Sequence, residues 1–283
     1  MTKLAKIGVG GNNPVRIMSI LNTSPESFYK KSVNTTKTHI KNAVKEMENQ
    51  GADFIDVGGM STAPYLTTLV SEETESKRIL DAVKIIQNNS NLPISVDTCR
   101  AKVARDALQN GVEIINDISG LKYDKKMPDV ISEYCPSLIL CAHSPNTVYG
   151  NHVDATKKLL RESLDIALKS SHVSSGQIVL DPAIGFFRKT GENPFFTKIN
   201  SDWTRRDLSI LQNLKAIKQK YPILISVSNK SFIGNVLGKD NPSDRSYGST
   251  AAEAISVING ADIIRTHNVG ATLDAIRIAL SLK

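Results

Sequence analysis

The stretch Ile178-Val-Leu-Asp181-Pro182-Ala-Ile-Gly185 decides the fold prediction for this chain. Its first three residues are large and apolar without any polar alternation, which indicates a strand buried on both faces of a parallel sheet. Pro182 ends the strand because it has no N–H to donate to a neighbouring strand. Asp181 therefore stands at the carboxyl end of a buried strand, where α/β barrels and doubly wound sheets bind ligands. Taken alone, Asp181 fits a helix cap or a turn equally well.

The same arrangement recurs along the 283 residues. Further apolar strands are predicted at 17–21, 54–57, 93–96, 113–115, 137–142, 222–227 and 261–264. Helical spacing separates most of them, as at 35–50, 154–171, 206–220 and 271–282. A lead-in strand is expected at about 4–11, in place for a hairpin with 16–21. Eight strand–helix units without a linker predict a single-domain α/β protein over 1–283, a (β/α)8 TIM barrel.

An open doubly wound sheet is the alternative fold. The chain lacks both nucleotide-binding fingerprints of such sheets, since no GxGxxG follows the first strand and no GxxxxGK[ST] occurs anywhere. This absence favours the barrel.

Composition limits the classes of partner. The formal charge is +7, but no block of five or six like charges occurs, so a small anionic ligand is favoured over a nucleic acid. The three cysteines form no CxxC pair, which is typical of a reducing compartment. No apolar run approaches membrane-spanning length and the N-terminus lacks a signal-like apolar segment. We therefore expect a cytoplasmic protein that binds no membrane and no nucleic acid.

Each predicted strand leads into a polar residue, and in a barrel these residues meet at one mouth. The set is Asn22, Asp56, Asp97, Asn116, His143, Asp181, Lys230 and His267. It contains no Ser–His–Asp arrangement and no HExxH zinc motif. Carboxylates and amides suit the edge of a planar heterocycle that carries both N–H donors and carbonyl acceptors. Arg265 and His267 beside Asn22 suit an anionic group, and Asn22 is a candidate ligand of a hard cation.

Seven motifs stand in order, each at the end of a predicted strand. They are Ile20-Leu-Asn22-Thr-Ser-Pro25-Glu-Ser-Phe28, Gly51-Ala-Asp-Phe-Ile-Asp56-Val-Gly-Gly59, Ser95-Val-Asp97-Thr98, Ile114-Ile-Asn116-Asp117-Ile-Ser-Gly120, Leu180-Asp181-Pro182 with Gly185-Phe186, Ser228-Asn-Lys230-Ser-Phe-Ile-Gly234 and Gly260-Ala-Asp-Ile-Ile-Arg265-Thr-His267. With these motifs the chain resembles the dihydropteroate synthase family from about residue 15 to residue 280.

The resemblance implies a (β/α)8 fold and a transferase of folate biosynthesis. Hydroxymethyl-dihydropterin diphosphate would lose diphosphate, and the amine of 4-aminobenzoate or of a related arylamine would capture the pterin cation. By position, Asp97, Asn116, Asp181 and Lys230 would hold the pterin; Asn22, Thr62, Arg265 and His267 would hold the diphosphate. Asn22 would also bind Mg²⁺, and Lys230, Asp97 and Arg265 would act in catalysis. The expected partners are these two small substrates, and a homodimer is the oligomer considered.

Three segments depart from the family pattern. Tyr29-Lys-Lys-Ser stands where Asp-Gly-Gly is usual, Ala63 stands where arginine is usual, and Ser228-Asn-Lys230 replaces Ser-Arg-Lys. Loss of arginine at position 63 predicts more space on the arylamine side. It leaves open, beside 4-aminobenzoate, a larger acceptor, an arylamine with a phosphorylated ribose of the methanopterin type. The basic residues available for its phosphate are Lys30, Lys31, Arg188, Lys189 and Arg205.

Two other functions stay open at this point. One is a pterin-dependent methyltransferase that acts with a corrinoid protein, which would share Asp97 and Asn116 but would not need Lys230 or the Arg265-x-His267 pair. The other is a non-catalytic pterin-binding paralogue, because altered loops beside an intact pocket are what loss of activity would leave.

Overall fold

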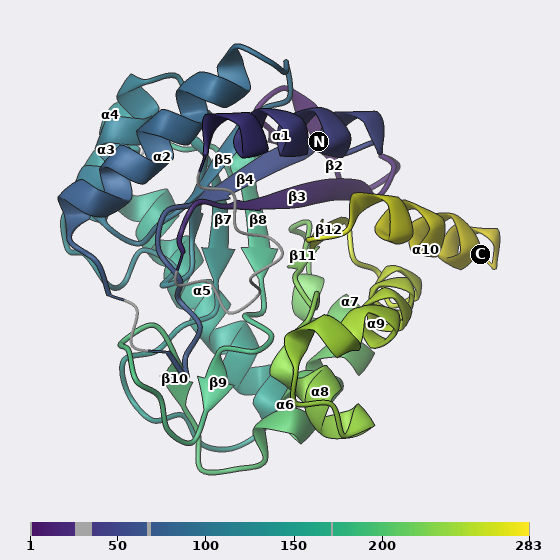
Figure 1. The fold of residues 1–283 in the computed structure, drawn as a ribbon. Coiled ribbons are helices and arrows are strands. Elements are labelled where there is room, and N and C mark those ends of the chain that lie inside the picture. The colour runs from purple at the N-terminus through teal and green to yellow at the C-terminus, as the bar shows by residue number, and fades with distance from the viewer. Residues whose placement is uncertain (1, 26–35, 67–68, 171, 283) are drawn as a thin grey trace.

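A computed structural model of the chain describes residues 2–25, 36–66, 69–170 and 172–282. Eight parallel strands form one sheet in the order β11-β12-β3-β4-β5-β6-β7-β8 (Figure 1). Their bounds are β3 Arg16–Asn22, β4 Phe54–Gly58, β5 Ile94–Asp97, β6 Ile114–Asp117, β7 Ser137–Cys141, β8 Ile178–Asp181, β11 Leu224–Ile225 and β12 Ile263–Thr266. The two edges meet where Leu180 pairs with Ile223, and the Leu180 N–H donates to the Pro222 carbonyl at 2.9 Å. The sheet is thus closed, and the predicted (β/α)8 barrel is confirmed.

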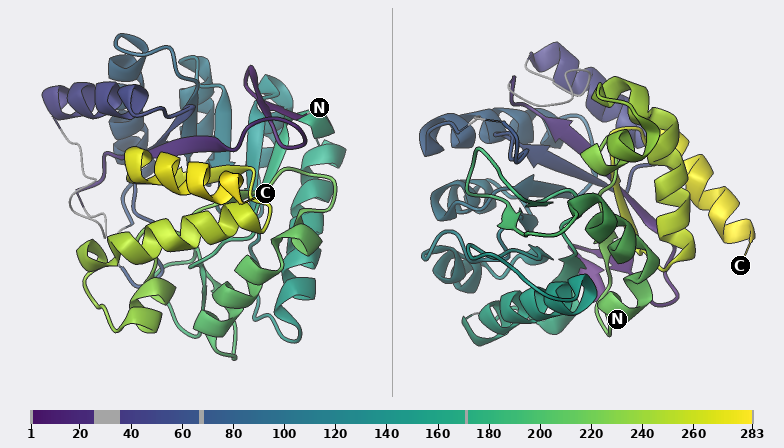
Figure 2. Two further views of the ribbon diagram at one scale, coloured as in Figure 1. Left: turned by 90° about the vertical axis from the view of Figure 1, so that its right-hand side faces the viewer. Right: turned by 90° about the horizontal axis from the view of Figure 1, so that it is seen from below.

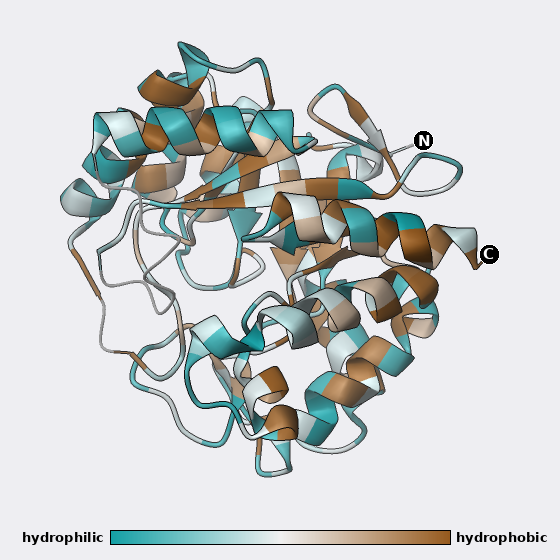
Figure 3. Ribbon diagram, turned by 45° about the vertical axis from the view of Figure 1, so that its right-hand side comes forward, coloured by the Kyte–Doolittle hydropathy of each residue, from teal (hydrophilic) through white to brown (hydrophobic). Residues whose placement is uncertain are grey.

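Helices surround the strands (Figure 2). They are α1 Lys37–Asn49, α2 Glu72–Gln87, α3 Ala101–Gln109, α4 Met127–Tyr134, α5 His152–Ser170, α6 Trp203–Gln212, α7 Leu214–Lys218, α8 Ser231–Leu237, α9 Ser246–Ile258 and α10 Val269–Ser281. Each carries both hydrophobic and hydrophilic residues (Figure 3), as helices do when one side packs on a core and the other faces water. The strands between them are almost fully buried, as their unbroken apolar runs predict.

The predicted single strand at 4–11 is wrong. Residues in this part form two short antiparallel strands, β1 Thr2–Leu4 and β2 Ile7–Val9, which pair with each other and not with 16–21. The chain reverses at Ala5, whose φ of 50° lies in the left-handed region. The hairpin closes the amino end of the barrel, where buried Leu4 and Val9 pack with Met18 and Phe54.

The predicted helix at 206–220 is also different. It begins earlier, because the Asp202 side chain accepts the backbone N–H groups of Thr204 and Arg205 and caps α6 at Trp203. It then breaks at Asn213 into α6 and α7. Two short helices, α4 and α8, have too few turns to show a clear apolar period and were not predicted. Between β8 and α6, two further short strands pair in parallel, β9 Phe187–Arg188 and β10 Thr197–Lys198.

Candidate active site

A cavity of about 70 Å³ opens among the carboxyl ends of the barrel strands. Six of the predicted site residues line it: Asn22, Thr62, Asp97, Lys230, Arg265 and His267. They come from five different strand–helix connections, so only closure of the barrel brings them together. Neither Asn116 nor Asp181 lines the cavity, although both are buried near the carboxyl ends of their strands, β6 and β8.

Arg265 on β12 links two carboxylates from neighbouring strands. Its Nε donates to Asp56 Oδ2 at 2.6 Å and its Nη2 donates to Asp97 Oδ2 at 2.8 Å. Asp56 is fully buried and also accepts a hydrogen bond of 3.0 Å from Asn116 Nδ2. Its other oxygen, Oδ1, has no hydrogen-bond partner among the residues that the structure describes. Asp56 is therefore the acceptor at the centre of this network, a role that its place at a strand end did not by itself reveal.

The carboxylate of Asp97 is held in an unusual electrostatic state. Burial raises its pKa to about 7, although the Arg265 guanidinium lowers it and Asp56 adds to the increase. A carboxyl group with a pKa near neutrality changes charge in response to small changes at the site. Asp97 thus accepts hydrogen bonds when it is a carboxylate, and its protonation state changes when a charged ligand binds beside it.

Lys230 precedes α8 and reaches into the cavity over the ring of Phe186, with Nζ 4.0 Å from the ring centroid. Burial lowers its pKa to about 8, and the positive charge of Arg265 adds to that effect. The carboxylate of Asp181 acts in the opposite direction and favours the ammonium form. Lys230 is therefore mostly a cation at pH 7, and the negative charge of Asp181 stabilises that form.

Asp181 itself ends β8, as predicted. Its Oδ1 accepts the backbone N–H of Ala183 at 2.7 Å, which holds the turn after the strand. Burial raises the pKa of Asp181, and Lys230 opposes that shift. The interpretation of Asp181 as a turn residue is thus correct for one oxygen and does not account for its electrostatic interaction with Lys230.

His267 follows β12 and Asn22 ends β3, and both line the cavity. His267 Nδ1 is 3.0 Å from Ser228 Oγ, and burial lowers the pKa of the imidazole to about 3. The imidazole is therefore neutral at pH 7 and offers hydrogen bonding without charge. Asn22 offers an amide oxygen at the end of β3, where it lines the cavity with Thr62.

The 60–66 segment covers one side of the cavity and is tied to the connection after β8. Asn193 Nδ2 donates to the Ala63 carbonyl at 2.8 Å, and the Glu192 N–H donates to the Pro64 carbonyl at 2.7 Å. Ala63 is only 8% exposed. Ala63 nevertheless lines the cavity, in a segment held against the connection after β8.

The other two departures have different outcomes. Asn229 has a φ of 58° and is buried; its N–H donates to Ser249 Oγ and its carbonyl accepts from Arg245 Nη1. Asparagine tolerates this left-handed conformation better than most residues. The Tyr29-Lys-Lys-Ser segment, with Lys30 and Lys31, lies outside the described residues.

Sequence reasoning placed Arg188 at the rim among surface charges, but the structure buries it. Its side chain is 8% exposed, its guanidinium lies 3.8 Å from the Trp203 ring centroid, and it lines the cavity with Tyr65 and Ser231. Lys189 and Arg205 are exposed. The sequence around an isolated arginine on a predicted loop does not indicate that it is buried. The burial of Arg188 depends on its packing against Trp203 of α6. His143 forms a contact of 3.4 Å with the Pro194 carbonyl outside the cavity.

Known proteins share this arrangement. Residues 18–267 match the family described as pterin binding enzyme. A dihydropteroate synthase of Clostridium beijerinckii is 38% identical over 89% of this chain and 88% of its own length. The chain belongs to the dihydropteroate synthase family of pterin-binding enzymes. The predicted resemblance is thereby confirmed.

Solved structures of the family agree in fold. A dihydropteroate synthase of Clostridium difficile, crystallised in the presence of pteroic acid, is 33% identical with a TM-score of 0.82, covering 95% of this chain and 97% of that one. The Xanthomonas albilineans enzyme with 4-aminobenzoic acid is 28% identical with a TM-score of 0.82, covering 96% and 93%. Among the described residues, no helix is both long and apolar enough to cross a membrane.

Proposed function

We propose that this chain is a dihydropteroate synthase, which joins hydroxymethyl-dihydropterin diphosphate to 4-aminobenzoate and releases diphosphate. The observation that carries the proposal is the cluster of Asp56, Asp97 and Asn116 around Arg265 at the mouth of a family barrel. It combines hydrogen-bond acceptors for a ring that carries N–H groups with a cation for the leaving group. A corrinoid-dependent methyltransferase would need no cation pair such as Lys230 and Arg265.

The pterin half of the reaction would use the carboxylate-rich side of the cavity. Asp97 would accept from the N–H groups of the ring and Lys230 would donate to a ring acceptor. Asp181 and Asn116, buried at the ends of β8 and β6 but outside the cavity lining, would add an acceptor and an amide once the pterin enters. Loss of diphosphate leaves a positive charge on the pterin, which three nearby carboxylates favour: Asp56, Asp97 and Asp181. A carboxylate that is partly protonated in the free protein becomes fully charged beside such a cation. No side-chain nucleophile is needed.

The leaving diphosphate would be held by Asn22, Thr62, Arg265 and His267. Arg265 supplies positive charge, whereas the low pKa of His267 makes it a neutral hydrogen-bonding partner in the free protein. When diphosphate enters, Arg265 exchanges part of its contact with Asp97 for phosphate oxygens. This exchange frees the Asp97 carboxylate for the pterin and links binding of the two halves of the substrate.

Mg²⁺ would have one protein ligand in this donor set, the amide oxygen of Asn22. No three His, Cys, Asp or Glu side chains within the described ranges gather to hold a metal ion. Mg²⁺ commonly uses few protein ligands and completes its shell with water and substrate phosphates, so the amide oxygen of Asn22 suffices for such a site. When bound, the ion would neutralise negative charge on the departing diphosphate.

For the acceptor, the buried Arg188 is a cation available to an acidic group beside those assigned to the pterin diphosphate, Lys230 and Arg265, whereas Lys189 and Arg205 are exposed. The contacts that hold the 60–66 segment against the connection after β8 favour 4-aminobenzoate over an arylamine with a phosphorylated ribose, because they restrain one wall of the cavity. Comparing kcat/KM for the two acceptors tests this choice. A preference for the ribosylated, phosphorylated arylamine would overturn it.

The reaction itself is tested by diphosphate release. Purified protein is mixed with hydroxymethyl-dihydropterin diphosphate, 4-aminobenzoate and Mg²⁺, and diphosphate is measured together with dihydropteroate. We expect equal amounts of both products and loss of turnover when EDTA removes Mg²⁺. Tight pterin binding without product would instead indicate a non-catalytic pterin-binding protein. Methyl transfer from a methyl-tetrahydropterin would indicate the corrinoid-dependent alternative.

We also propose a homodimer. Apolar side chains on α6, α8 and α9 are exposed together around a groove: Leu208 at 37%, Val236 at 58%, Leu237 at 46% and Ile255 at 50%. Contiguous exposed apolar residues of this kind are typical of an interface. Sedimentation velocity should give a dimer that Val236→Glu converts to a monomer. A wild-type monomer at micromolar concentration would contradict the proposal.

A further inference from the structure

An ion pair outside the cavity lining forms hydrogen bonds to the connection after β8. Arg206 and Asp207, consecutive residues of α6, are both 0% exposed. Their charged groups meet at 3.0 Å, between Arg206 Nη1 and Asp207 Oδ1. Burying an ion pair is costly and contributes little net stability, because both charges lose their water. The position of this pair therefore calls for an explanation beyond packing.

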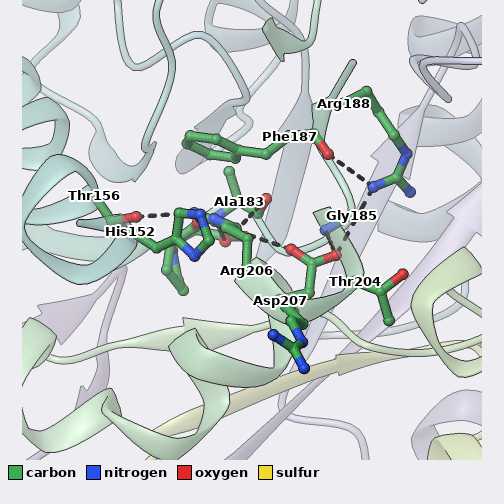
Figure 4. A network of polar contacts seen from close by, with 12 residues as sticks. His152, Thr156, Ala183, Gly185, Phe187, Arg188, Thr204, Arg206 and Asp207 are labelled. Atoms are coloured by element: carbon green, nitrogen blue, oxygen red, sulfur yellow. Dashed lines mark hydrogen bonds and ion pairs between the residues drawn. The ribbon is translucent and has the colours of Figure 1, made fainter. Parts of the chain in front are cut away.

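The pair holds three backbone groups within four residues. Arg206 Nη2 donates to the Pro182 carbonyl at 2.6 Å and Nη1 donates to the Ala183 carbonyl at 3.3 Å. Asp207 Oδ2 accepts the Gly185 N–H at 3.0 Å. Dashed lines in Figure 4 join the Asp207 carboxylate to Arg206, Gly185 and Arg188. The 182–186 loop is thus fixed from behind by charged hydrogen bonds, which are stronger than neutral ones.

The loop needs this support because its backbone is unusual. Ala183 has a φ of 57° and Gly185 a φ of 87°, both in the left-handed region. For alanine this conformation costs about 1–3 kcal/mol and persists only where the surroundings enforce it. Contacts to the carbonyl of Ala183 and to the N–H of Gly185 therefore act at the two residues with positive φ.

On its other side the loop forms the wall on which Lys230 lies. A Cβ atom added at Gly185 would stand 2.7 Å from Lys230 Cδ, so the glycine backbone is in direct contact with the lysine stem. The ring of Phe186 lies 4.0 Å from Lys230 Nζ. A shift of the loop therefore moves Lys230 as well.

We propose that the buried Arg206–Asp207 pair is a positioning element of the active site, which holds the 182–186 loop so that Gly185 and Phe186 fix the side chain of Lys230. The role of Lys230 in catalysis rests on the proposed function, whereas its placement by the pair does not. The pair touches no substrate; it acts through the loop and through Asp207 Oδ2, which also lies 3.9 Å from Nη1 of the cavity residue Arg188.

The titration of Lys230 reports the charge of Asp207 as well as the position of the loop, so it is read together with pterin affinity. Its charged neighbours are Arg265 and Arg188, which lower the pKa of the ammonium group, and Asp181 and Asp207, which raise it. Replacement of Asp207 by asparagine keeps an oxygen for the Gly185 N–H but removes the negative charge. It also leaves the positive charge of Arg206 uncompensated. Both changes disfavour the ammonium form, so the midpoint of Lys230 should fall.

The experiment compares the Asp207→Asn variant with wild type in the full chain. NMR of protein with ¹⁵N-labelled lysine gives the Lys230 midpoint, with Lys230→Arg to assign the signal. Binding of a pterin without diphosphate is measured on the same samples. We expect the midpoint to fall by about 0.5–1 pH unit. Pterin affinity should fall about tenfold, equivalent to about 1.4 kcal/mol.

Two further variants separate positioning from general stability. Gly185→Ala changes no charge but pushes on Lys230, and its folded form should also lose pterin affinity. Glu253→Gln neutralises another buried carboxyl group, on α9 and away from the cavity, and should leave affinity and the Lys230 midpoint unchanged. If Asp207→Asn does not fold, Arg206→Lys decides, because lysine keeps the positive charge but lacks the planar guanidinium that donates to the Pro182 and Ala183 carbonyls; wild-type pterin affinity in this variant overturns the proposal.

An unchanged Lys230 midpoint in folded Asp207→Asn, or wild-type pterin affinity in folded Gly185→Ala, overturns the proposal. If the proposed function is wrong, the same experiments give a different result. Wild-type protein would then release no diphosphate, while the Lys230 midpoint would still move in Asp207→Asn. The two inferences are therefore tested independently.

Discussion

At the amino ends of the strands, Leu4 and Val9 of the hairpin pack against Met18 and Phe54 in an apolar cluster with almost no exposed surface. At the carboxyl ends, Asp56 and Asp97 are drawn from the same barrel but surround a guanidinium group. The apolar end stabilises the fold through burial, at about 25 cal/mol per Å² of apolar surface. At the charged end, removing the charged groups from water costs free energy, and the result is a binding site. One barrel thus separates stability from chemistry along its axis.

Arg265→Ala tests this separation most severely. It leaves the fully buried Asp56 without its cation, and breaking a buried pair on one side costs about 3–5 kcal/mol. We expect a lower free energy of unfolding in urea together with a loss of turnover larger than the loss of affinity for a pterin without diphosphate. Arg265→Lys keeps the charge but cannot bridge both carboxylates, and should be intermediate. Full stability in Arg265→Ala would show that the network is not needed by the fold.

Leu4→Ala acts at the opposite end. Leu4 is 0% exposed, and truncation of a buried leucine typically costs about 2–5 kcal/mol. The free energy of unfolding should fall by this amount, while kcat/KM of the folded enzyme stays at the wild-type value. Ile278→Ala, at a side chain 65% exposed on α10, is the matched control and should change little. A change in kcat/KM for Leu4→Ala would contradict the division between the two ends.

Asp181→Asn should weaken pterin binding with little effect on folding. The amide replaces one acceptor by a donor, and loss of a charged hydrogen bond costs about 1.5–3 kcal/mol, equivalent to about 10–150-fold in affinity. Asp117→Asn is the matched control, because Asp117 Oδ1 and Oδ2 accept only within its own turn, from Ser119 and Leu121. That change should lower stability and spare affinity. Wild-type affinity in folded Asp181→Asn would remove Asp181 from the site.

The dependence of kcat/KM on pH is the finest test of the charged end. Asp97 accepts hydrogen bonds as a carboxylate, so activity should fall as pH drops below its pKa of about 7. Lys230 donates as an ammonium group, so activity should fall as pH rises above about 8. Each limb should approach a tenfold loss per pH unit. Lys230→Arg should abolish the alkaline limb, and persistence of that limb would assign it to another group.

Much of this organisation follows from local sequence. The apolar run before Asp181 predicts a strand buried on both faces, and the polar residue after each strand predicts a shared mouth. Six of the eight predicted binding residues line the cavity for that reason. The errors occur where local patterns compete. Ala5 turns the chain inside an apolar stretch, and Asn213 interrupts a helix whose stripe continues past it.

By itself, the sequence determined the eight strands, the family and the strand-end residues, because strand burial and strand-end chemistry depend on neighbours along the chain. Only the tertiary structure decided what those residues contact. Arg265 bridges Asp56 and Asp97 from positions more than 160 residues away. Arg188, which looks like surface charge in sequence, is buried against Trp203, and Ala63 is covered by a loop 130 residues distant. Such partners are set by barrel closure and side-chain packing, which no local pattern encodes.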